Sequence, residues 1–489
     1  MLTRSMIEQM AVNDSSFKNG EKLYDKGSFY ELKRTEDSKV YWALCEGSGK
    51  NPYKVSVDMS DESKLPVCRC SCPSRQFPCK HGIGLMLSIA AGKDFCVDEI
   101  PSEIKEKHEK AEEREAKKIA KQAKPKKVTA ASIKASEKKI EKQLEGLDLC
   151  RKMMNELMTS GLATLSGTSL EKFRELSAEL YNYGLPGPQR IINRIAESVA
   201  NFRDSEKNED KSKEFYAGTL KHLIHLNTVV KKGRAFLEKK LADKDFAESD
   251  DILFEELGGI WKLESLDKIG SFQENARLIE LSFDETEDNI KEEIQQKSYC
   301  MNLDTKEICV KLNMVPVKIR SKVRLAESCF DMIRVPVLYK YPGTDRVRYD
   351  NFTTSKIEGS DLNELVMCAE ENFEVAEKKF KNYIKNTLHE KELMVLLPAA
   401  EVFQTDDSVF MKDAQGNMLE LVMDTEHVTD INTLRYLPAA FANMKALYYP
   451  PDFDEVKAIF GKMFFNESKK GIQFQLYSVV TAKKIIRIV

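Results

Sequence analysis

The sequence predicts a multidomain α+β protein. The chain has 489 residues, and at about 100–200 residues per domain it should form two to four domains. Hydrophobic residues make up 42% of the chain and aromatic residues 9%, which is enough to bury several cores and too much for a disordered protein. The local pattern also changes along the chain, from short strands to a charged run, then to helices, and finally to mixed strands and helices. We therefore expect several structural units of different kinds.

Charge and hydropathy exclude two function classes. Lys and Arg number 76 against 79 Asp and Glu, a net charge of −3, so the chain as a whole is not a polyanion binder and any nucleic-acid role must depend on a local patch. The longest apolar stretch, Gly82–Ala91, is far shorter than the ~20 residues that a membrane span needs. Glu8 lies where a signal peptide would have its apolar core. We expect a cytoplasmic protein without a membrane segment.

Residues 1–98 have the pattern of a small β/α unit. Val40–Cys45 and Tyr53–Val57 are rich in β-branched and aromatic residues, which favours strands. Gly47–Pro52, between them, has the residues of a turn. Gly82–Gly92 predicts a short buried helix that ends at its terminal glycine.

Residues 99–137 are predicted to form a charged linker that is basic toward its C-terminal end. Residues 103–115 contain six Glu and four Lys or Arg, whereas residues 116–142 contain ten Lys and two Glu, a local net charge of +8. Pro125 interrupts the helical pattern, so we expect the linker to be partly helical. Such a run is either a solvated spacer or a basic tether that contacts phosphates or an acidic partner.

Residues 138–245 have helical apolar spacing throughout, which predicts a small helical bundle. The apolar face of its first helix consists of Ile140, Leu144, Leu147, Met154 and Met158.

Two regions of mixed strands and helices follow, at 250–350 and 351–489. Strands are predicted at Ile308–Leu312, Val335–Tyr339, Leu393–Leu397 and Ile485–Val489, with a hairpin of Ser408–Lys412 and Met418–Val422 around the turn Asp413–Asn417. Helices are predicted at Asn372–Ile384 and Asp454–Phe460.

The cysteines indicate one metal site. Seven of the eleven are scattered, as small buried hydrophobes are in a reducing compartment, but four lie within residues 68–79. A dense cysteine group in an otherwise cysteine-poor chain is typical of a metal site. The segment from residue 68 to residue 81 has the sequence CRCSCPSRQFPCKH.

Zinc in a structural site takes four Cys or His ligands in a tetrahedron. Cys79 and His81 supply one pair at the start of the predicted helix. The other pair is Cys68 with Cys70 or Cys70 with Cys72, because a Cys-x-Cys pair on an extended segment points both sulfurs to one side. An iron–sulfur site of the four cysteines is a further alternative, although it would leave His81 unused.

The segment from Cys70 to Leu85 closely resembles the SWIM-type zinc finger, whose pattern is Cys-x-Cys-x(n)-Cys-x-His. Trp42–Val55 is similar to the segment that precedes this finger in bacterial SWIM proteins, and Trp261–Leu266 with Asn275–Phe283 resembles the long bacterial members. The resemblance implies one structural zinc ion, Zn²⁺, and so a zinc-binding role for the β/α unit at 1–98. The ligand set that it implies is Cys70, Cys72, Cys79 and His81.

The resemblance also implies a module that binds proteins or nucleic acid. Long SWIM proteins are often encoded beside MoxR-type AAA ATPases and von Willebrand A proteins, which makes such proteins the expected partners. We expect binding rather than catalysis, because protein ligands fill all four zinc positions and leave none for water. An unrecognised enzyme in residues 250–489 is a third, less favoured alternative, because no catalytic constellation is visible there.

Two partner classes remain open. In the adaptor hypothesis, the finger and the long C-terminal region bind proteins. In the alternative, Arg69, Arg75, Lys80 and the basic run 117–142 contact the phosphates of DNA or RNA. The near-neutral net charge favours the adaptor. Elsewhere, His222 and His225 are three residues apart on a predicted helix, but no carboxylate motif accompanies them, and we expect a surface or capping role.

Overall fold

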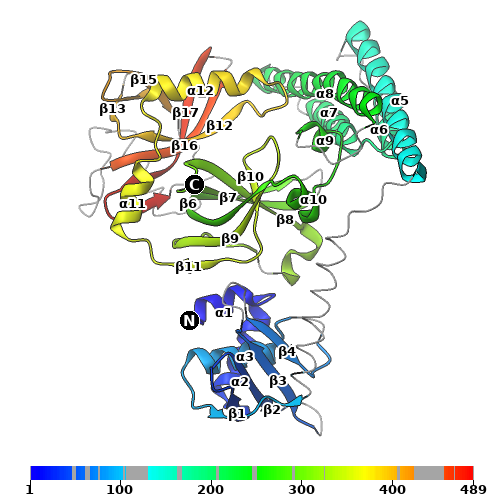
Figure 1. The fold of residues 1–489 in the computed structure, drawn as a ribbon. Helices are drawn as coiled ribbons and strands as arrows, with labels where there is room; N and C mark the ends of the chain where they lie inside the picture. Colours follow the sequence, from blue (N-terminus) through cyan, green and yellow to red (C-terminus); the bar gives the residue numbers. More distant parts are fainter. Residues whose placement is uncertain are drawn as a thin grey trace.

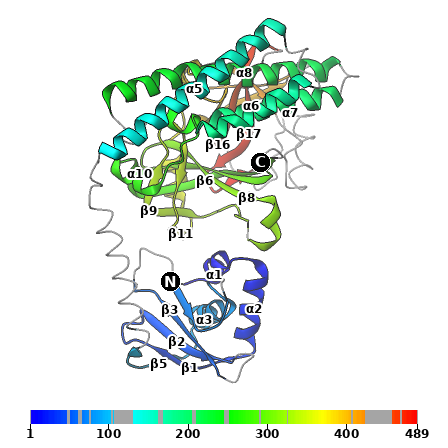
Figure 2. The same ribbon diagram turned by 90° about the vertical axis from the view of Figure 1, so that its right-hand side faces the viewer.

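The computed structural model describes most of the chain (Figures 1 and 2). The described residues are 2–46, 51–60, 66–74, 77–102, 105, 130–161, 168–204, 209–244, 251–288, 292–323, 325–404, 408–422, 456–466 and 469–487. They form helices and several separate sheets, and the predicted multidomain α+β class is confirmed. Among these residues, no helix combines the length and the apolar composition needed to cross a membrane.

The N-terminal unit is a five-stranded sheet with helices on one face. Its strand order is β4-β3-β2-β1-β5, in which the first four strands form an antiparallel meander and β5 is parallel to β1. The strands are β1 (Phe29–Arg34), β2 (Val40–Cys45), β3 (Tyr53–Asp58), β4 (Val67–Cys70) and β5 (Cys96–Val97), and the helices are α1 (Arg4–Met10), α2 (Asp14–Asp25) and α3 (Lys80–Ala90). The predictions of two strands and one helix here are confirmed.

Helix α3 packs across this sheet, as Figure 2 shows. Ile83, Leu85 and Met86 are fully buried against Val55 and Val57 of β3. Helices α2 and α3 approach each other closely at Gly84. A Cβ atom at this position would lie 2.7 Å from the Phe29 ring and 2.9 Å from the backbone oxygen of Gly20 in α2. A glycine at position 84 therefore sets how closely the two helices approach.

Four long helices follow the linker: α5 (Ala130–Ser160), α6 (Thr168–Asn182), α7 (Pro186–Asp204) and α8 (Glu209–Asp243). They share one core, which includes Leu147, Ile195 and Leu226. Helix α5 begins inside the segment predicted as linker, whereas residues 106–129, with Pro125, lie outside the described residues. Met158, predicted on the buried face of the first helix, is 76% exposed, because Leu157 occupies the core position in that turn.

A closed five-stranded barrel follows the short helices α9 (Leu253–Glu256) and α10 (Leu263–Lys268). Its strands are β6 (Phe272–Asp288), β7 (Glu293–Asn302), β8 (Glu307–Pro316), β9 (Met332–Lys340) and β10 (Arg346–Arg348). The order is β10-β8-β7-β6-β9, and an additional β10–β9 pairing closes the ring. Side chains from all five strands fill its interior.

The connectivity of the barrel is that of the OB-fold, a five-stranded Greek-key barrel. The long first strand, β6, pairs with β9 along its first half and with β7 along its second, and a bulge lies between Glu280 and Ser282. The third and fifth strands, β8 and β10, are parallel, and a short 3₁₀ helix (Val317–Lys322) joins the third strand to the fourth. A further strand, β11 (Thr353–Ser355), pairs with β9.

The C-terminal sheet has the order β12-β16-β17-β15-β14-β13, with β18 paired to β17. Its elements are β12 (Glu392–Pro398), β13 (Glu401–Gln404), β14 (Val409–Lys412), β15 (Met418–Val422), β16 (Val456–Asn466), β17 (Gly471–Thr481) and β18 (Ile485–Arg487), with helices α11 (Gly359–Val366) and α12 (Phe373–Lys385) before it. One face packs on the outside of the barrel and the other is covered by α12 (Figure 1). The predicted hairpin of β14 and β15 and the predicted helix at Asn372–Ile384 are confirmed.

The helix predicted at Asp454–Phe460 is wrong from Val456 onward, and its first two residues lie outside the described residues. Residues from Val456 onward form β16, a central strand that pairs antiparallel with both β12 and β17. Four successive residues, 458–461, are buried because the barrel covers one face of the sheet and α12 the other. A strand buried on both faces loses its alternation of polar and apolar residues, and its sequence then resembles that of a buried helix.

Candidate metal centre

Four metal-binding side chains converge at the junction of β4 and α3. The Sγ atoms of Cys70, Cys72 and Cys79 and a ring nitrogen of His81 all lie within 4.8 Å of one another. The Nδ1 atom of His81 is 3.7 Å from Sγ of Cys70 and 3.8 Å from Sγ of Cys79. The structure thus brings together the four residues that the resemblance to the SWIM finger implies as the ligand set.

The first two thiols come from the end of the sheet. Cys70 is the last residue of β4 and pairs with Val55 of β3. The chain then stays attached to β3, because the Ser71 N–H donates to the Lys54 carbonyl at 3.0 Å and the Lys54 N–H donates to the Ser71 hydroxyl at 2.9 Å. These bonds fix the backbone between Cys70 and Cys72.

The other two side chains come from the first turn of α3. Cys79 is the N-cap residue, and its side chain makes no capping hydrogen bond to the helix backbone. His81 is 4% exposed, and its ring lies 4.8 Å from the ring of Tyr53 on β3. A helix N-terminus carries a partial positive charge, which stabilises a thiolate at the position of Cys79.

These residues fit a tetrahedral zinc ion. With Zn–S bonds near 2.3 Å and a Zn–N bond near 2.0–2.1 Å, sulfur and nitrogen ligands lie about 3.6 Å apart. The two sulfur-to-nitrogen distances given above are within about 0.2 Å of that value. Three thiolates and one imidazole are also a donor set that selects zinc in structural sites.

The three cysteine thiols of the cluster have pKa values shifted in different directions. Hydrogen bonds from the Cys70 thiol and from His81 lower the pKa of Cys79 despite burial. The hydrogen bond between Cys70 and Cys79, with burial, raises the pKa of Cys70, and burial raises the pKa of Cys72. A bound divalent cation would supply the positive charge that allows all three thiols to ionise.

Cys68 lies outside the cluster. It is half-buried beneath α3, where its Sγ is 3.3 Å from the position that a Cβ on Gly82 would occupy. Burial raises the pKa of its thiol to about 12. Cys68 thus packs in the core of the unit, and the iron–sulfur alternative, which needs Cys68 in place of His81, does not correspond to the cluster that the fold assembles.

Residues 53–90 match the family model of the SWIM zinc finger. The chain contains a SWIM zinc finger. The matched segment begins at β3, includes β4 and the four clustered side chains, and ends with α3. No curated protein and no solved structure matches the chain. The resemblance of Trp261–Leu266 and Asn275–Phe283 to long SWIM proteins lies outside the matched segment and stays a prediction.

The residues predicted for phosphate contact differ in their exposure, and some of them lie outside the described residues. Lys80 is exposed at the first position of α3, whereas Arg69 is half-buried on β4. Arg75 lies outside the described residues, as does the part of the basic run before residue 130; the part after it forms the start of α5. His225, in contrast, is part of the helical unit, where its Nε2 lies 2.8 Å from Oε2 of Glu256 and links α8 to α9.

Sequence reasoning missed a groove beside the SWIM finger. It has a volume of about 550 Å³ and runs between α2 and the finger. Ser16, Asn19 and Leu23 of α2 line one wall, and Glu46, Tyr53, Cys72, Pro73, Ser74, Lys80 and His81 line the remainder. Among the described lining residues, the two that carry a charge are Glu46 and Lys80, and their charges have opposite signs. No local signal in the sequence indicates that α2 lies beside the finger.

Proposed function

We propose that the SWIM finger holds one structural zinc ion and that the protein acts as an adaptor that binds other proteins through the finger. Cys70, Cys72, Cys79 and His81 would be the ligands, and the ion would tie the end of the sheet to the start of α3. With four protein ligands, no coordination position remains for substrate or water, so the zinc would have a structural role. This supports binding rather than catalysis.

The observation that carries the adaptor role is the composition of the groove. A site for a polyanion needs several Lys or Arg residues that face the ligand, but the described groove has one cation, Lys80, and one carboxylate, Glu46. Hydroxyl, amide, aromatic and proline side chains make up much of the rest, as is usual at protein interfaces. Phe77, on the loop between the two ligand pairs, is 61% exposed and offers an apolar anchor next to the finger.

The expected partners are AAA ATPases or von Willebrand A proteins, on the strength of the resemblance to long SWIM proteins. Nucleic-acid binding is the second candidate function. It is favoured by the local net charge of +8 in residues 116–142, which would add to Lys80 if the linker and the finger met one phosphate backbone.

Affinity capture with the full-length protein tests the adaptor role. The protein is incubated with extract of the native cell, with and without nuclease, and retained proteins are identified by mass spectrometry. Asn19→Arg places a bulky cation in the groove from an exposed position on α2, and it should abolish retention of a genuine partner. Asn51→Arg is the matched control, since Asn51 is exposed and does not line the groove.

The binding must then be reproduced between the purified partner and each of three purified proteins: the unmodified protein, the Asn19→Arg variant and the Asn51→Arg variant. Nuclease-resistant binding that Asn19→Arg removes and Asn51→Arg preserves would support the adaptor role through the finger. Binding that nuclease abolishes would favour the nucleic-acid alternative instead. Partner binding that is equal for both variants would contradict the use of the groove.

A further inference from the structure

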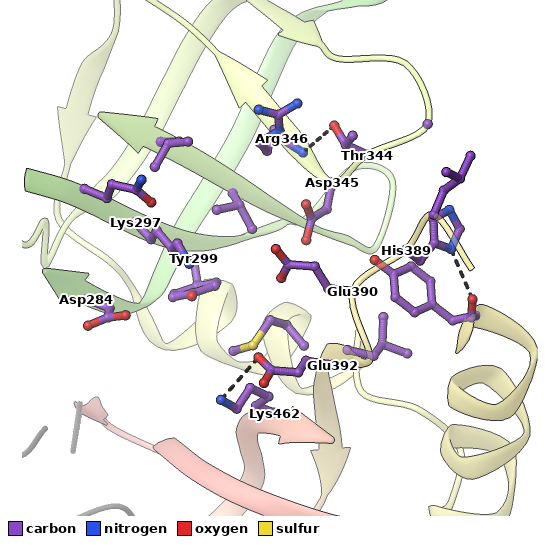
Figure 3. Close-up of a pocket in the computed structure, with 18 of the residues that line it drawn as sticks. Asp284, Lys297, Tyr299, Thr344, Asp345, Arg346, His389, Glu390, Glu392 and Lys462 are labelled. Carbon is purple, nitrogen blue, oxygen red and sulfur yellow. Dashed lines mark hydrogen bonds and ion pairs between the residues drawn. The ribbon is translucent and has the colours of Figure 1, made fainter. Parts of the chain in front are cut away.

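A cavity of about 540 Å³ lies on the outer face of the barrel, far in the sequence from the SWIM finger. Its floor is formed by Lys297 and Tyr299 of β7 and by Val310 and Leu312 of β8. The β9–β10 loop, residues 343–345, forms one side, and residues 388–394 at the start of β12 form the opposite side (Figure 3). This volume is within the range of small-molecule sites, roughly 300–1,000 Å³.

The position of the cavity corresponds to the ligand-binding face of OB-fold barrels. Such barrels bind oligonucleotides or oligosaccharides on the face of the second and third strands, between the loops that join the first to the second and the fourth to the fifth strand. Here these strands are β7 and β8, and the latter loop contains Asp345. The C-terminal sheet covers part of the same face, with Gln475 of β17 and Lys462 of β16 in the lining. A shared fold does not by itself determine the ligand, which the side chains must decide.

The charges of the cavity do not cancel. Several lining residues are already paired: Arg346 with Glu255, Lys462 with Glu392 at 3.3 Å, Glu256 with His225 at 2.8 Å, and Arg194 with Asp288 at 3.7 Å. Within the described part of the chain, the charged lining residues without an ion pair are three carboxylates, Asp284, Asp345 and Glu390, and one ammonium group, Lys297. The unpaired groups thus sum to −2, which disfavours a nucleic acid.

Two of these carboxylates point toward one another. Figure 3 shows Asp345, from the β9–β10 loop, and Glu390, from the segment before β12, directed into the same space. Burial raises the pKa of Asp345 and the charge of Glu390 raises it further, whereas the charges of Arg346 and Lys297 lower it. Burial, together with the charges of both carboxylates, also raises the pKa of the neighbouring Tyr383 to about 12.

Two largely buried polar side chains also line the cavity. Tyr299 and Gln475 are each 7% exposed and line the cavity. In the described part of the chain, neither the Tyr299 hydroxyl nor the Gln475 amide makes a hydrogen bond with another side chain. Buried polar groups are almost always hydrogen-bonded, so a polar ligand or water that enters the cavity would satisfy both.

We propose that this cavity binds an organic cation, whose ammonium or guanidinium group lies between the carboxylates of Asp345 and Glu390. Tyr299 and Gln475 would accept or donate hydrogen bonds to the rest of the ligand, and the Tyr299 and Tyr383 rings would contact its aliphatic part. Free polyamines and Lys or Arg side chains of peptides both present this chemistry. The inference concerns a site in the barrel and does not depend on the proposed function of the finger.

Isothermal titration calorimetry with the full-length protein tests this site. The probes are spermidine and two capped tripeptides, Gly-Lys-Gly and Gly-Arg-Gly, with capped Gly-Met-Gly as the neutral comparison. Asp345→Asn combined with Glu390→Gln removes both facing charges and should weaken binding of the cationic probes at least about tenfold. Binding of spermidine alone would identify the source as a free polyamine, and binding of the tripeptides would identify it as a peptide side chain.

Glu274→Gln combined with Glu371→Gln is the matched control, because both residues are exposed, outside the cavity, and carry the same total charge. It should leave affinity within about twofold. Tyr299→Phe provides a second, smaller change and should weaken binding about three- to tenfold. Failure of all three cationic probes to bind at millimolar concentration would overturn the proposal. Equal affinity for the test and control double variants, stronger binding of Gly-Met-Gly, or displacement of the probe by Mg²⁺ would also overturn it.

Discussion

The guanidinium group of Arg487 lies 3.0 Å from the carboxylate of Glu280, and this buried ion pair joins the last strand, β18, to the first strand of the barrel, β6. The carboxylate also accepts hydrogen bonds from the Ser298 hydroxyl, from the Ser328 hydroxyl at 2.8 Å and from the Cys329 N–H at 2.9 Å. Arg487 in turn donates to the Glu280 and Cys329 carbonyls. This group of polar contacts adds to the apolar packing between the barrel and the C-terminal sheet.

Removal of one partner of this pair should be costly. Arg487→Met removes the ion-pair partner of the buried Glu280 carboxylate, and we expect a loss of about 3–5 kcal/mol in the stability of the barrel at neutral pH. Proteins with several domains generally do not unfold in two states, so one midpoint would not isolate the barrel. The measurement is therefore hydrogen exchange by mass spectrometry on peptides from β6 and β18. Unchanged exchange in these peptides would contradict the prediction.

The cost should depend on pH in a defined direction. Burial raises the pKa of Glu280 in the folded protein, and Arg487 opposes that rise. A carboxyl whose folded pKa lies above the unfolded value of about 4.3 binds a proton more tightly when folded, so its contribution to stability falls as pH rises above that value. Without Arg487 the folded pKa rises further, and the loss in Arg487→Met should grow with increasing pH. The double variant Arg487→Met with Glu280→Gln removes the buried charge and should recover most of the stability; a double variant as unstable as the single one would show that the charge is not the cause.

Zinc content tests the metal assignment. Freshly purified protein should contain about one zinc ion per chain, because three thiolates and one imidazole bind zinc strongly at neutral pH. Elemental analysis by mass spectrometry gives the identity and the stoichiometry. Iron with visible absorbance, or a protein free of metal, would contradict the assignment.

Single substitutions test the ligand set. Cys79→Ser and His81→Ala should each abolish stoichiometric zinc and increase hydrogen exchange in β4 and α3, because an apo site loses the free energy that the metal supplies to folding. Cys68→Ser is the matched control, since Cys68 belongs to the same CRC segment but packs in the core. Loss of zinc in Cys68→Ser with retention in Cys72→Ser would show that the ligand set is shifted by one pair.

Salt dependence separates the two partner classes. If nucleic acid is the ligand, log–log plots of affinity against salt should have a slope of about −0.9 per neutralised phosphate on duplex DNA and about −0.7 on single strands. The variant to use replaces the six lysines between residues 117 and 127 by glutamine. A deletion through residue 142 would remove the start of α5, where Ile140 is buried in the helical core.

These replacements should flatten the slope without changing the zinc content, because the segment lies outside the finger. The adaptor role predicts little or no binding to duplex or single-stranded nucleic acid at about 0.15 M salt. Tight, salt-dependent binding that the glutamine variant weakens would make nucleic acid the first choice of partner. Absence of binding under these conditions would leave the adaptor role as the remaining candidate.

The predictions from sequence succeeded where local residues decide the structure and failed where contacts between distant segments decide it. Val40–Cys45 and Tyr53–Val57 form strands as their β-branched and aromatic composition predicts, because composition is a property of the segment itself. The same reasoning failed for β16 because cover on both faces, by the barrel and by α12, is a property of distant segments. Closure of the barrel through β8, β9 and β10 also depends on pairings between distant strands, which no local pattern encodes.

The sequence by itself determined the chemistry of the finger, because cysteine and histidine at fixed short spacing restrict which metal can bind and which residues can hold it. Tertiary structure decided which cysteines take part. Cys68 and Cys70 share one side of β4, yet the start of α3 covers Cys68 and leaves Cys70 beside His81. Tertiary structure also places Asp345 and Glu390 on one cavity, because Asp345 comes from a loop of the barrel and Glu390 from the segment before β12. Short-range spacing fixes ligand chemistry, whereas the packing of separate units fixes which side chains meet.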